Sequence, residues 1–309
     1  MNKSIFEKII ISASALILSS TLYASGGGDG GDGGGDGGDG GTPPSSSECG
    51  PAPTDSQLLQ TGDSGPFNVS SKSVSDYAAS GFGGGTIWYP NNADCGRMGG
   101  IAVVPGYVSY ESSIEWWGER LASWGFVVIT IDTDSIYDQP DSRADQLSAA
   151  LDHIIGDSTV GSMVDSSRLG AIGWSMGGGG SLKLATERST VKAIIPQAPY
   201  YSGLNDFDEV DAATFLIACE DDSIAPVSSH VDDFWDDVPN STSKMYIEIN
   251  GGDHYCANSG NSDEDILGRA GISWMKRYID GDTRFNNYLC GNVSFSSRDV
   301  SDYRYNNCP

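Results

Sequence analysis

The chain has 309 residues, which corresponds to one large domain or two small ones. Hydrophobic residues make up 38% and aromatic residues 10% of it, enough for a sizeable core and too many for a disordered chain. With 17 basic and 42 acidic residues, the net charge is −25. This charge argues against a nucleic-acid binder, which needs basic residues against the phosphates, and against docking on anionic lipid.

Residues 1–24 are predicted to be a secretory signal peptide. Lys3 and Lys8 precede a short apolar stretch, and Ala24 is a small residue suited to cleavage. The apolar stretch is shorter than the roughly 20 residues of a membrane-spanning helix, and no later segment is long and apolar enough to cross a bilayer. We therefore expect a protein without a membrane anchor that is secreted to the extracellular space, either directly or by way of a periplasm.

Residues 25–48 are predicted to be a flexible linker. Within them, residues 26–41 consist of twelve Gly and four Asp. A calcium-binding Gly/Asp repeat would need a regularly placed apolar residue, and this run has none, so the linker is favoured. The acidity is not confined to this run, because residues 42–309 contain 15 basic and 37 acidic residues, a net charge of −22.

The remaining segment, residues 49–309, is predicted to be a single catalytic domain in which strands alternate with helices. Two early strands, joined through Gly-rich turns, are expected at 67–74 and 86–89. The other expected strands are short and largely apolar: 101–104, 126–131, 169–174, 193–195, 214–218 and 246–249. Expected helices start at Ser112 or Ser113 and run to about residue 124, cover 141–155, begin near residue 176, and cover 266–279. This alternation predicts an α/β sandwich with a mostly parallel central sheet flanked by helices.

Residues 173–177, Gly-Trp-Ser-Met-Gly, are the one match to G-x-S-x-G in the chain. An apolar strand precedes the motif and a helical segment follows it, which is the setting of the nucleophile elbow in the α/β-hydrolase fold. The alternative is a glycine-rich turn with an incidental serine. The context favours Ser175 as the nucleophile, held above the sheet at a helix N-terminus.

Three histidines are candidates for the general base. In the α/β-hydrolase chain order, the nucleophile is followed by an acid and then by the histidine. His153 precedes Ser175, and His230 leaves little chain for an acid, so both are expected to be ordinary surface residues. His254 follows a predicted strand and fits the order.

The triad acid is expected at the end of the strand over residues 214–219. Glu220, Asp221 and Asp222 follow that strand, and composition does not separate them. One of the three is expected to orient His254 and to stabilise its imidazolium.

Six cysteines occur in the chain, and an even number in an exported protein indicates disulfides. Six cysteines allow fifteen pairings, and the sequence by itself does not choose among them. The residues are Cys49, Cys95, Cys219, Cys256, Cys290 and Cys308.

Several segments together carry a family resemblance. They are residues 105–107, 112–114, 116–118, 126–133, 173–182, 196–199, 218–220, 222–227, 248–252, 254 and 257–262. Over about residues 66–308 the chain resembles the bacterial cutinase-like polyester hydrolases, specifically the poly(ethylene terephthalate) hydrolase group of the α/β-hydrolase superfamily.

The resemblance implies which acid and which cysteine pairs are used. The family's aspartate falls on Asp222, and the implied disulfides are Cys219–Cys256 and Cys290–Cys308. The first would fix the two loops that carry the acid and the base against each other. Cys49 and Cys95 lie outside the common pattern and are expected to pair with each other.

The resemblance also implies the binding site. The oxyanion hole falls on the backbone N–H groups of Tyr107 and Met176. The residues expected to contact substrate are Tyr107, Trp174, Met176, Tyr200, Ile224, Gln139, Tyr255 and Asn258. Two of them depart from the family pattern: Tyr200 stands where a tryptophan is usual, and the bulky Tyr255 follows the histidine, which should narrow the cleft.

The expected activity is that of a serine ester hydrolase, acting on cutin-like and poly(ethylene terephthalate)-like polyesters and on short-chain esters through an acyl-enzyme. We expect a monomer without a lid domain, which needs no metal or cofactor and has no nucleic-acid or membrane partner. The alternative is a general short-chain carboxylesterase or lipase without useful polyester activity. A non-catalytic acidic surface protein is disfavoured by the complete Ser, Asp and His set. We interpret the acidity as an adaptation to salty water, where screening relieves self-repulsion.

Overall fold

The computed structural model describes residues 48–203 and 207–309. The predicted signal peptide (residues 1–24) and all but the last residue of the predicted linker (residues 25–48) lie outside the described residues. In the described part of the chain, no helix has the length and apolar character needed to span a bilayer.

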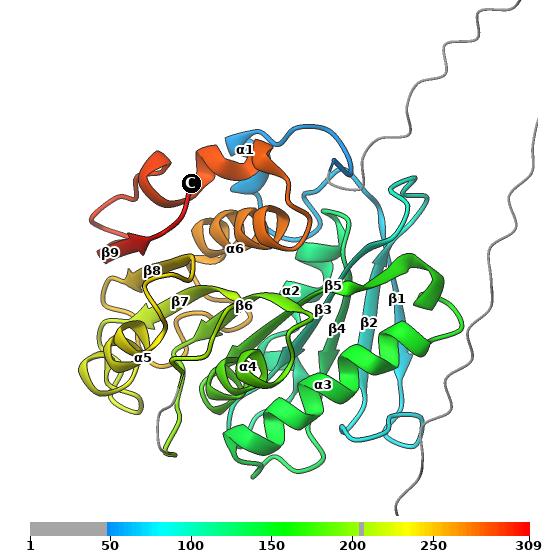
Figure 1. Ribbon diagram of the computed structural model, residues 1–309, viewed down its shortest axis with the longest axis horizontal. Helices are drawn as coiled ribbons and strands as arrows, with labels where there is room; N and C mark the ends of the chain where they lie inside the picture. Colours follow the sequence, from blue (N-terminus) through cyan, green and yellow to red (C-terminus); the bar gives the residue numbers. More distant parts are fainter. Residues whose placement is uncertain (1–47, 204–206) are drawn as a thin grey trace, which may run out of the picture. The chain divides into compact units, whose positions relative to one another are not determined.

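One sheet of nine strands forms the centre of the described domain (Figure 1). The strands are β1 (Val69–Val74), β2 (Gly85–Pro90), β3 (Met98–Val104), β4 (Val127–Ile131), β5 (Val164–Trp174), β6 (Val191–Gln197), β7 (Ala213–Cys219), β8 (Lys244–Ile249) and β9 (Val300–Asn306). Their order across the sheet is β1-β2-β4-β3-β5-β6-β7-β8-β9. All neighbours from β4 to β8 in this order pair in parallel, whereas β1–β2, β2–β4 and β8–β9 pair antiparallel. The predicted α/β fold with a mostly parallel sheet is therefore confirmed.

Helices cover both faces of the sheet (Figure 1). On one face lie α3 (Pro140–Gly156), α4 (Met176–Glu187) and α5 (Val231–Asp237); on the other lie α1 (Asp55–Leu58), α2 (Trp116–Ala122) and α6 (Glu264–Tyr278). The central strands are consequently buried on both sides, which explains their continuous apolar runs. In β3, Ile101 and Val103 contribute to one core, while Ala102 and Val104 contribute to the other.

One α-helix, α1, and one strand, β9, were not expected from the sequence. The strand β9 alternates polar and aromatic residues and covers the open edge of β8, so its pairing partner rather than an apolar run determines that it is a strand.

The predicted start of α2 was wrong. The helix begins at Trp116, and its N-cap residue Glu115 makes no capping hydrogen bond through its side chain. Ser113 instead ends a 3-10 helix (Glu111–Ser113), and its hydroxyl donates to the Tyr110 carbonyl at 2.8 Å. Ser113 therefore belongs to the turn that precedes α2 and does not occupy its N-cap position.

Three disulfides are present: Cys49–Cys95, Cys219–Cys256 and Cys290–Cys308. They join the same pairs that the family resemblance and the two remaining cysteines implied. The described residues contain no free cysteine.

Candidate active site

Ser175 stands at the sharp turn between β5 and α4. Its backbone has φ +56° and ψ −121°, a conformation that a non-glycine residue adopts only when its surroundings enforce it. Both Gly173 and Gly177 are needed because neighbouring backbone atoms lie too close to these positions for a Cβ to fit. A Cβ on Gly173 would lie 2.0 Å from the Gly177 carbonyl oxygen, and one on Gly177 would lie 2.5 Å from the Pro105 carbonyl oxygen. The strand, the strained turn and the helix together form the predicted elbow.

Three buried polar side chains form one hydrogen-bonded chain at this turn. His254 Nε2 lies 2.8 Å from Ser175 Oγ, and His254 Nδ1 lies 2.6 Å from Asp222 Oδ2. Each of the three residues is 5–6% exposed. They follow β5, β7 and β8, and because these strands run parallel, their carboxyl ends meet at the same edge of the sheet.

Asp222 is the acid that reaches His254, whereas its two neighbours face solvent. Its Oδ1 accepts hydrogen bonds from the backbone N–H groups of Ile224 and Ala225, both at 2.8 Å. Burial by itself would raise the pKa of Asp222, but the hydrogen bonds from His254 and Ala225 outweigh it and hold the pKa below its ordinary value. An ionised Asp222 keeps the proton of His254 on Nδ1 and leaves Nε2 free to accept the serine proton.

The loops that carry Asp222 and His254 are tied to each other. The Cys219–Cys256 disulfide joins them, and the Asp221 N–H donates to the Gly252 carbonyl at 2.8 Å. Glu220 accepts a hydrogen bond from the Gly251 N–H at 2.7 Å. Glu220 and Asp221 therefore hold the loops together but do not contact His254.

The two backbone groups expected to form the oxyanion hole lie beside Ser175. Met176 is the first residue of α4, so its N–H has no acceptor within the helix. In residues 48–203 and 207–309, no protein acceptor is found for the N–H of Tyr107. The loop of Tyr107 touches the elbow, because a Cβ on Gly106 would lie 2.9 Å from the Cβ of Ser175.

Three exposed side chains stand on the loops of the site, next to Gly106, Asp222 and His254. Tyr107 and Tyr255 are 44% and 53% exposed, and Ile224 is 53% exposed. Trp174, which was expected to contact substrate, is only 3% exposed, and its ring centroid lies 5.3 Å from that of Tyr255. Its indole N–H donates to the His254 carbonyl at 2.8 Å, so Trp174 supports the histidine loop.

The other expected contact residues are half-buried or exposed. Met176 is half-buried, Gln139 is exposed, and Gln139 Nε2 donates to the Tyr137 carbonyl at 3.1 Å. Asn258 is half-buried, and its backbone joins it to the loop that follows His254. Tyr200 stacks on the ring of His230 at 5.0 Å.

His230 and His153 are both half-buried and lie outside the hydrogen-bonded chain from Asp222 to Ser175. His230 stacks on Tyr200, and its Nδ1 lies 3.1 Å from Ser229 Oγ. His153 lies on α3 with its ring against Phe82 at 5.4 Å. Sequence analysis also missed Tyr137, which is 61% exposed and meets the ring of Tyr107 edge-on at 5.8 Å. The sequence offered one signal for Tyr137, since it lies two residues before Gln139, which was expected to contact substrate.

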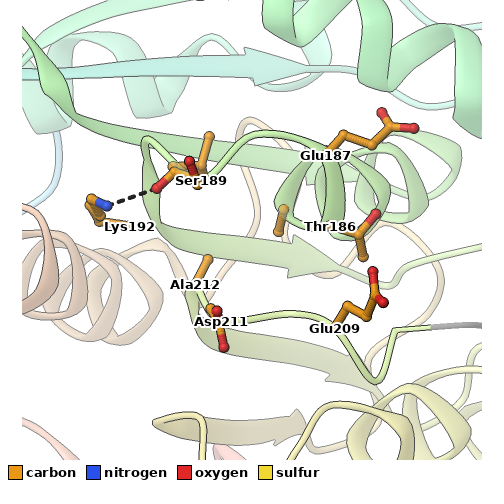
Figure 2. Close-up of a pocket in the computed structure, with 9 residues that line it drawn as sticks. Thr186, Glu187, Ser189, Lys192, Glu209, Asp211 and Ala212 are labelled. Atoms are coloured by element: carbon orange, nitrogen blue, oxygen red, sulfur yellow. Dashed lines mark hydrogen bonds between the residues drawn. The ribbon is translucent and has the colours of Figure 1, made fainter.

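A separate pocket of about 390 Å³ lies between α4, β6 and the segment before β7 (Figure 2). It opens near the amino ends of β6 and β7, the edge of the sheet opposite to Ser175. Figure 2 shows polar side chains around it, among them Glu187, Lys192 and Glu209, with Lys192 Nζ donating to the Ser189 carbonyl at 2.7 Å. None of the predicted site residues lines this pocket. Among the described residues, no group of three or more His, Cys, Asp or Glu side chains is arranged to hold a metal ion.

Comparison with known proteins gives one consistent family. A family model described as PET hydrolase-like matches residues 42–309. Lipase 1 of Moraxella sp. is 58% identical over 254 residues, which cover 82% of this chain and 78% of the relative. Cutinase 1 of Thermobifida cellulosilytica is 48% identical over 265 residues, covering 85% and 98%, and the bis(hydroxyethyl) terephthalate hydrolase of Streptomyces coelicolor is 45% identical over 262 residues, covering 85% and 82%. This chain belongs to the PET hydrolase-like family.

Proposed function

We propose that Ser175, His254 and Asp222 are the catalytic triad of a carboxylic ester hydrolase. The observation that carries the proposal is the unbroken hydrogen-bonded chain from Asp222 through His254 to Ser175 at a strained strand-to-helix turn. A serine hydroxyl is a weak nucleophile until an adjacent base accepts its proton. The arrangement supplies that base and the carboxylate that orients it.

The reaction follows from the positions of these groups. Ser175 Oγ attacks the ester carbonyl carbon while its proton passes to His254 Nε2, and the N–H groups of Tyr107 and Met176 stabilise the oxyanion. The C–O bond to the alcohol then breaks, and His254 donates its proton to the leaving alcohol. Water attacks the acyl-serine with His254 as base, and collapse of the second tetrahedral intermediate releases the acid and restores the Ser175 hydroxyl.

We propose polyesters as well as short-chain esters as substrates. The support is the exposed aromatic surface next to Ser175, on which the rings or chains of a polymer could lie, together with the cutinase and terephthalate ester hydrolase named among the relatives. The alternative is a general short-chain carboxylesterase or lipase, which the similarity to Lipase 1 also suits. The distinguishing measurement is a panel of p-nitrophenyl esters, triglycerides and polyester film.

The nucleophile is tested by Ser175→Ala, with Ser181→Ala as the matched control. Ser181 lies on the same helix and its hydroxyl donates to the Gly178 carbonyl at 2.8 Å, away from His254. We expect Ser175→Ala to abolish hydrolysis of p-nitrophenyl butyrate and labelling by a fluorophosphonate, with an unchanged circular dichroism spectrum. Ser181→Ala should retain both the hydrolysis of p-nitrophenyl butyrate and the labelling by fluorophosphonate. Hydrolysis by the folded Ser175→Ala protein would overturn the assignment.

We further propose that the protein is exported and acts as a monomer. Support for export comes from the basic and apolar N-terminal segment of the sequence and from three disulfides, which form in oxidising compartments. Expression of the full chain should place active protein in the culture medium with its N-terminus at or near Ser25. Gel filtration with light scattering should give the mass of one chain.

A further inference from the structure

We infer that Arg143 is a positioning residue for the oxyanion hole: its buried guanidinium fixes the backbone of the loop that carries the Tyr107 N–H. The inference rests on the proposed function, because it assigns Arg143 a part in stabilising the oxyanion formed by attack of Ser175.

Arg143 is completely buried, and its hydrogen bonds go to backbone carbonyl groups. From α3, Nη1 donates to the Pro105 carbonyl at 2.9 Å, Nε to the Asp138 carbonyl at 3.0 Å and Nη2 to the Ile136 carbonyl at 3.2 Å. No carboxylate of the described chain forms an ion pair with it. A planar guanidinium is the side chain that can hold three carbonyl groups in one fixed arrangement.

The guanidinium remains charged despite its burial. Burial lowers the pKa of Arg143 to about 10, and the neighbouring Asp138 carboxylate opposes that shift. Because this value lies well above neutral pH, the group is protonated at neutral pH. Charge-assisted hydrogen bonds to carbonyl groups are stronger than neutral ones, and a buried cation that lost them would be left unsatisfied.

These hydrogen bonds join two loops of the site. Ile136 lies in the loop between β4 and α3, and its carbonyl accepts from Arg143 and also from the Val108 N–H at 2.7 Å. Val108 has a φ of +53°, a left-handed conformation that is unfavourable for a β-branched residue. The loop therefore holds a strained shape directly after Tyr107, and its contacts with Ile136 and Arg143 maintain that shape.

On its other side the same loop lies against the nucleophile elbow. The Pro105 carbonyl that accepts from Arg143 is so close to α4 that a Cβ on Gly177 would lie 2.5 Å from it, and a Cβ on Gly106 would lie 2.9 Å from the Cβ of Ser175. The position of the Tyr107 N–H is thus set by Arg143 on one side and by the elbow on the other.

The position of the Tyr107 N–H should affect kcat more than it affects substrate binding. An oxyanion donor must lie within about 2.7–3.1 Å of the oxygen position in the tetrahedral intermediate, and removal of one donor costs about 10²- to 10³-fold in kcat. A small displacement of the loop should weaken one donor rather than remove it. We expect Arg143→Lys to lower kcat by about 10-fold to 100-fold, with KM changed by less than about threefold.

The experiment compares p-nitrophenyl butyrate with its thionoester, in which sulfur replaces the carbonyl oxygen. Sulfur accepts hydrogen bonds poorly, so an intact oxyanion hole favours the oxygen ester. If Arg143 acts through the oxyanion hole, Arg143→Lys should lower kcat/KM for the oxygen ester much more than for the thionoester, so that their ratio falls by at least about fivefold. A purely structural role would lower both rates by the same factor and leave the ratio unchanged.

The matched control is Arg120→Lys on α2. Arg120 is also completely buried, burial also lowers its pKa to about 10, and it donates to the Leu58 carbonyl and to Ser64 Oγ, away from the site. This variant should lose stability but keep the wild-type ratio of the two rates.

Arg143→Gln provides a second variant if Arg143→Lys fails to fold. Its shorter, neutral side chain loses the charge-assisted hydrogen bonds to the Pro105 and Ile136 carbonyls and should also lower the ratio. A wild-type ratio in a folded Arg143 variant would overturn the inference. Fluorophosphonate labelling of Ser175 in the same samples separates this outcome from a failure of the proposed function, in which Ser175 is not labelled at all.

Discussion

Removal of the Cys219–Cys256 disulfide should both destabilise the domain and loosen the triad. The two cysteines are 37 residues apart in the chain. The chain-entropy relation for a loop of this length gives about 4 kcal/mol of stabilisation through the unfolded state. For a domain of this size, 1 kcal/mol corresponds to about 2–4 °C in Tm. The Cys219→Ala/Cys256→Ala variant should therefore melt about 8–16 °C lower than the wild type.

Cys290→Ala/Cys308→Ala is the matched control for the effect on catalysis. Its cysteines are 18 residues apart, which gives about 3 kcal/mol by the same relation, and the bridge joins the segment after α6 to the end of β9. Both variants use alanine because a serine would leave a buried hydroxyl without a partner. The two should lose similar stability, measured by calorimetry at the same pH.

Only the first variant should lose activity at 25 °C. The Asp221 N–H to Gly252 hydrogen bond still connects the two triad loops, so we expect a fall in kcat of about tenfold, smaller than the roughly 10²-fold cost of a 1 Å misplacement. The assay is hydrolysis of p-nitrophenyl butyrate, normalised to the serine titrated by a fluorophosphonate. A loss in Tm below about 3 °C would refute the entropy argument, and equal kcat values in the two variants would refute the role of the bridge at the site.

Three further predictions concern single side chains. Hydrogen bonding holds the pKa of Asp222 below its ordinary value of about 3.9, so the stability that this carboxylate contributes is present above about pH 3.9 and is lost as the pH falls through the lower pKa of the folded state. Asp222→Asn should therefore flatten the acid side of the plot of Tm against pH and lower kcat by about 10⁴-fold, and an unchanged acid side would contradict the argument. Tyr255→Ser removes an exposed ring whose centroid lies 5.3 Å from that of Trp174. Product release from polyester film, relative to p-nitrophenyl butyrate turnover, should then rise by up to about tenfold, and an unchanged ratio would mean that this ring does not limit access of the polymer to Ser175. Asp280→Asn removes the carboxylate that pairs with the fully buried Lys276 at 2.5 Å and with Arg168 at 3.0 Å. It should cost about 3–5 kcal/mol in urea unfolding with kcat unchanged, whereas a loss below about 1 kcal/mol would show that these ion pairs are not needed.

Local pattern was sufficient where a residue's role depends on its chain neighbours. The elbow at Ser175 is encoded by two glycines between an apolar strand and a helix, and the close approaches at Gly173 and Gly177 explain why glycine stands there. With three histidines in the chain, the order of the triad residues was enough to select His254. The parallel centre of the sheet followed from strands that are apolar on both faces.

Roles that depend on contacts between distant segments were not visible in the same way. Composition left Glu220, Asp221 and Asp222 equivalent, and the structure separates them because the N–H groups of Ile224 and Ala225 turn toward Asp222. Arg143 had no recognisable signal, since its acceptors are backbone carbonyl groups, which any sequence supplies.

By itself, then, the sequence determined the fold class and selected Ser175 and His254 as the proposed nucleophile and base, because strand–turn–helix periodicity and chain order are properties of adjacent residues. Tertiary structure decided which carboxylate reaches His254, the burial of Trp174 beneath Tyr255, the stacking of Tyr200 on His230 and the anchoring of the Tyr107 loop. Each of these depends on which loops meet at the carboxyl edge of the sheet. That meeting is fixed by the strand order, in which residues far apart in the chain become neighbours.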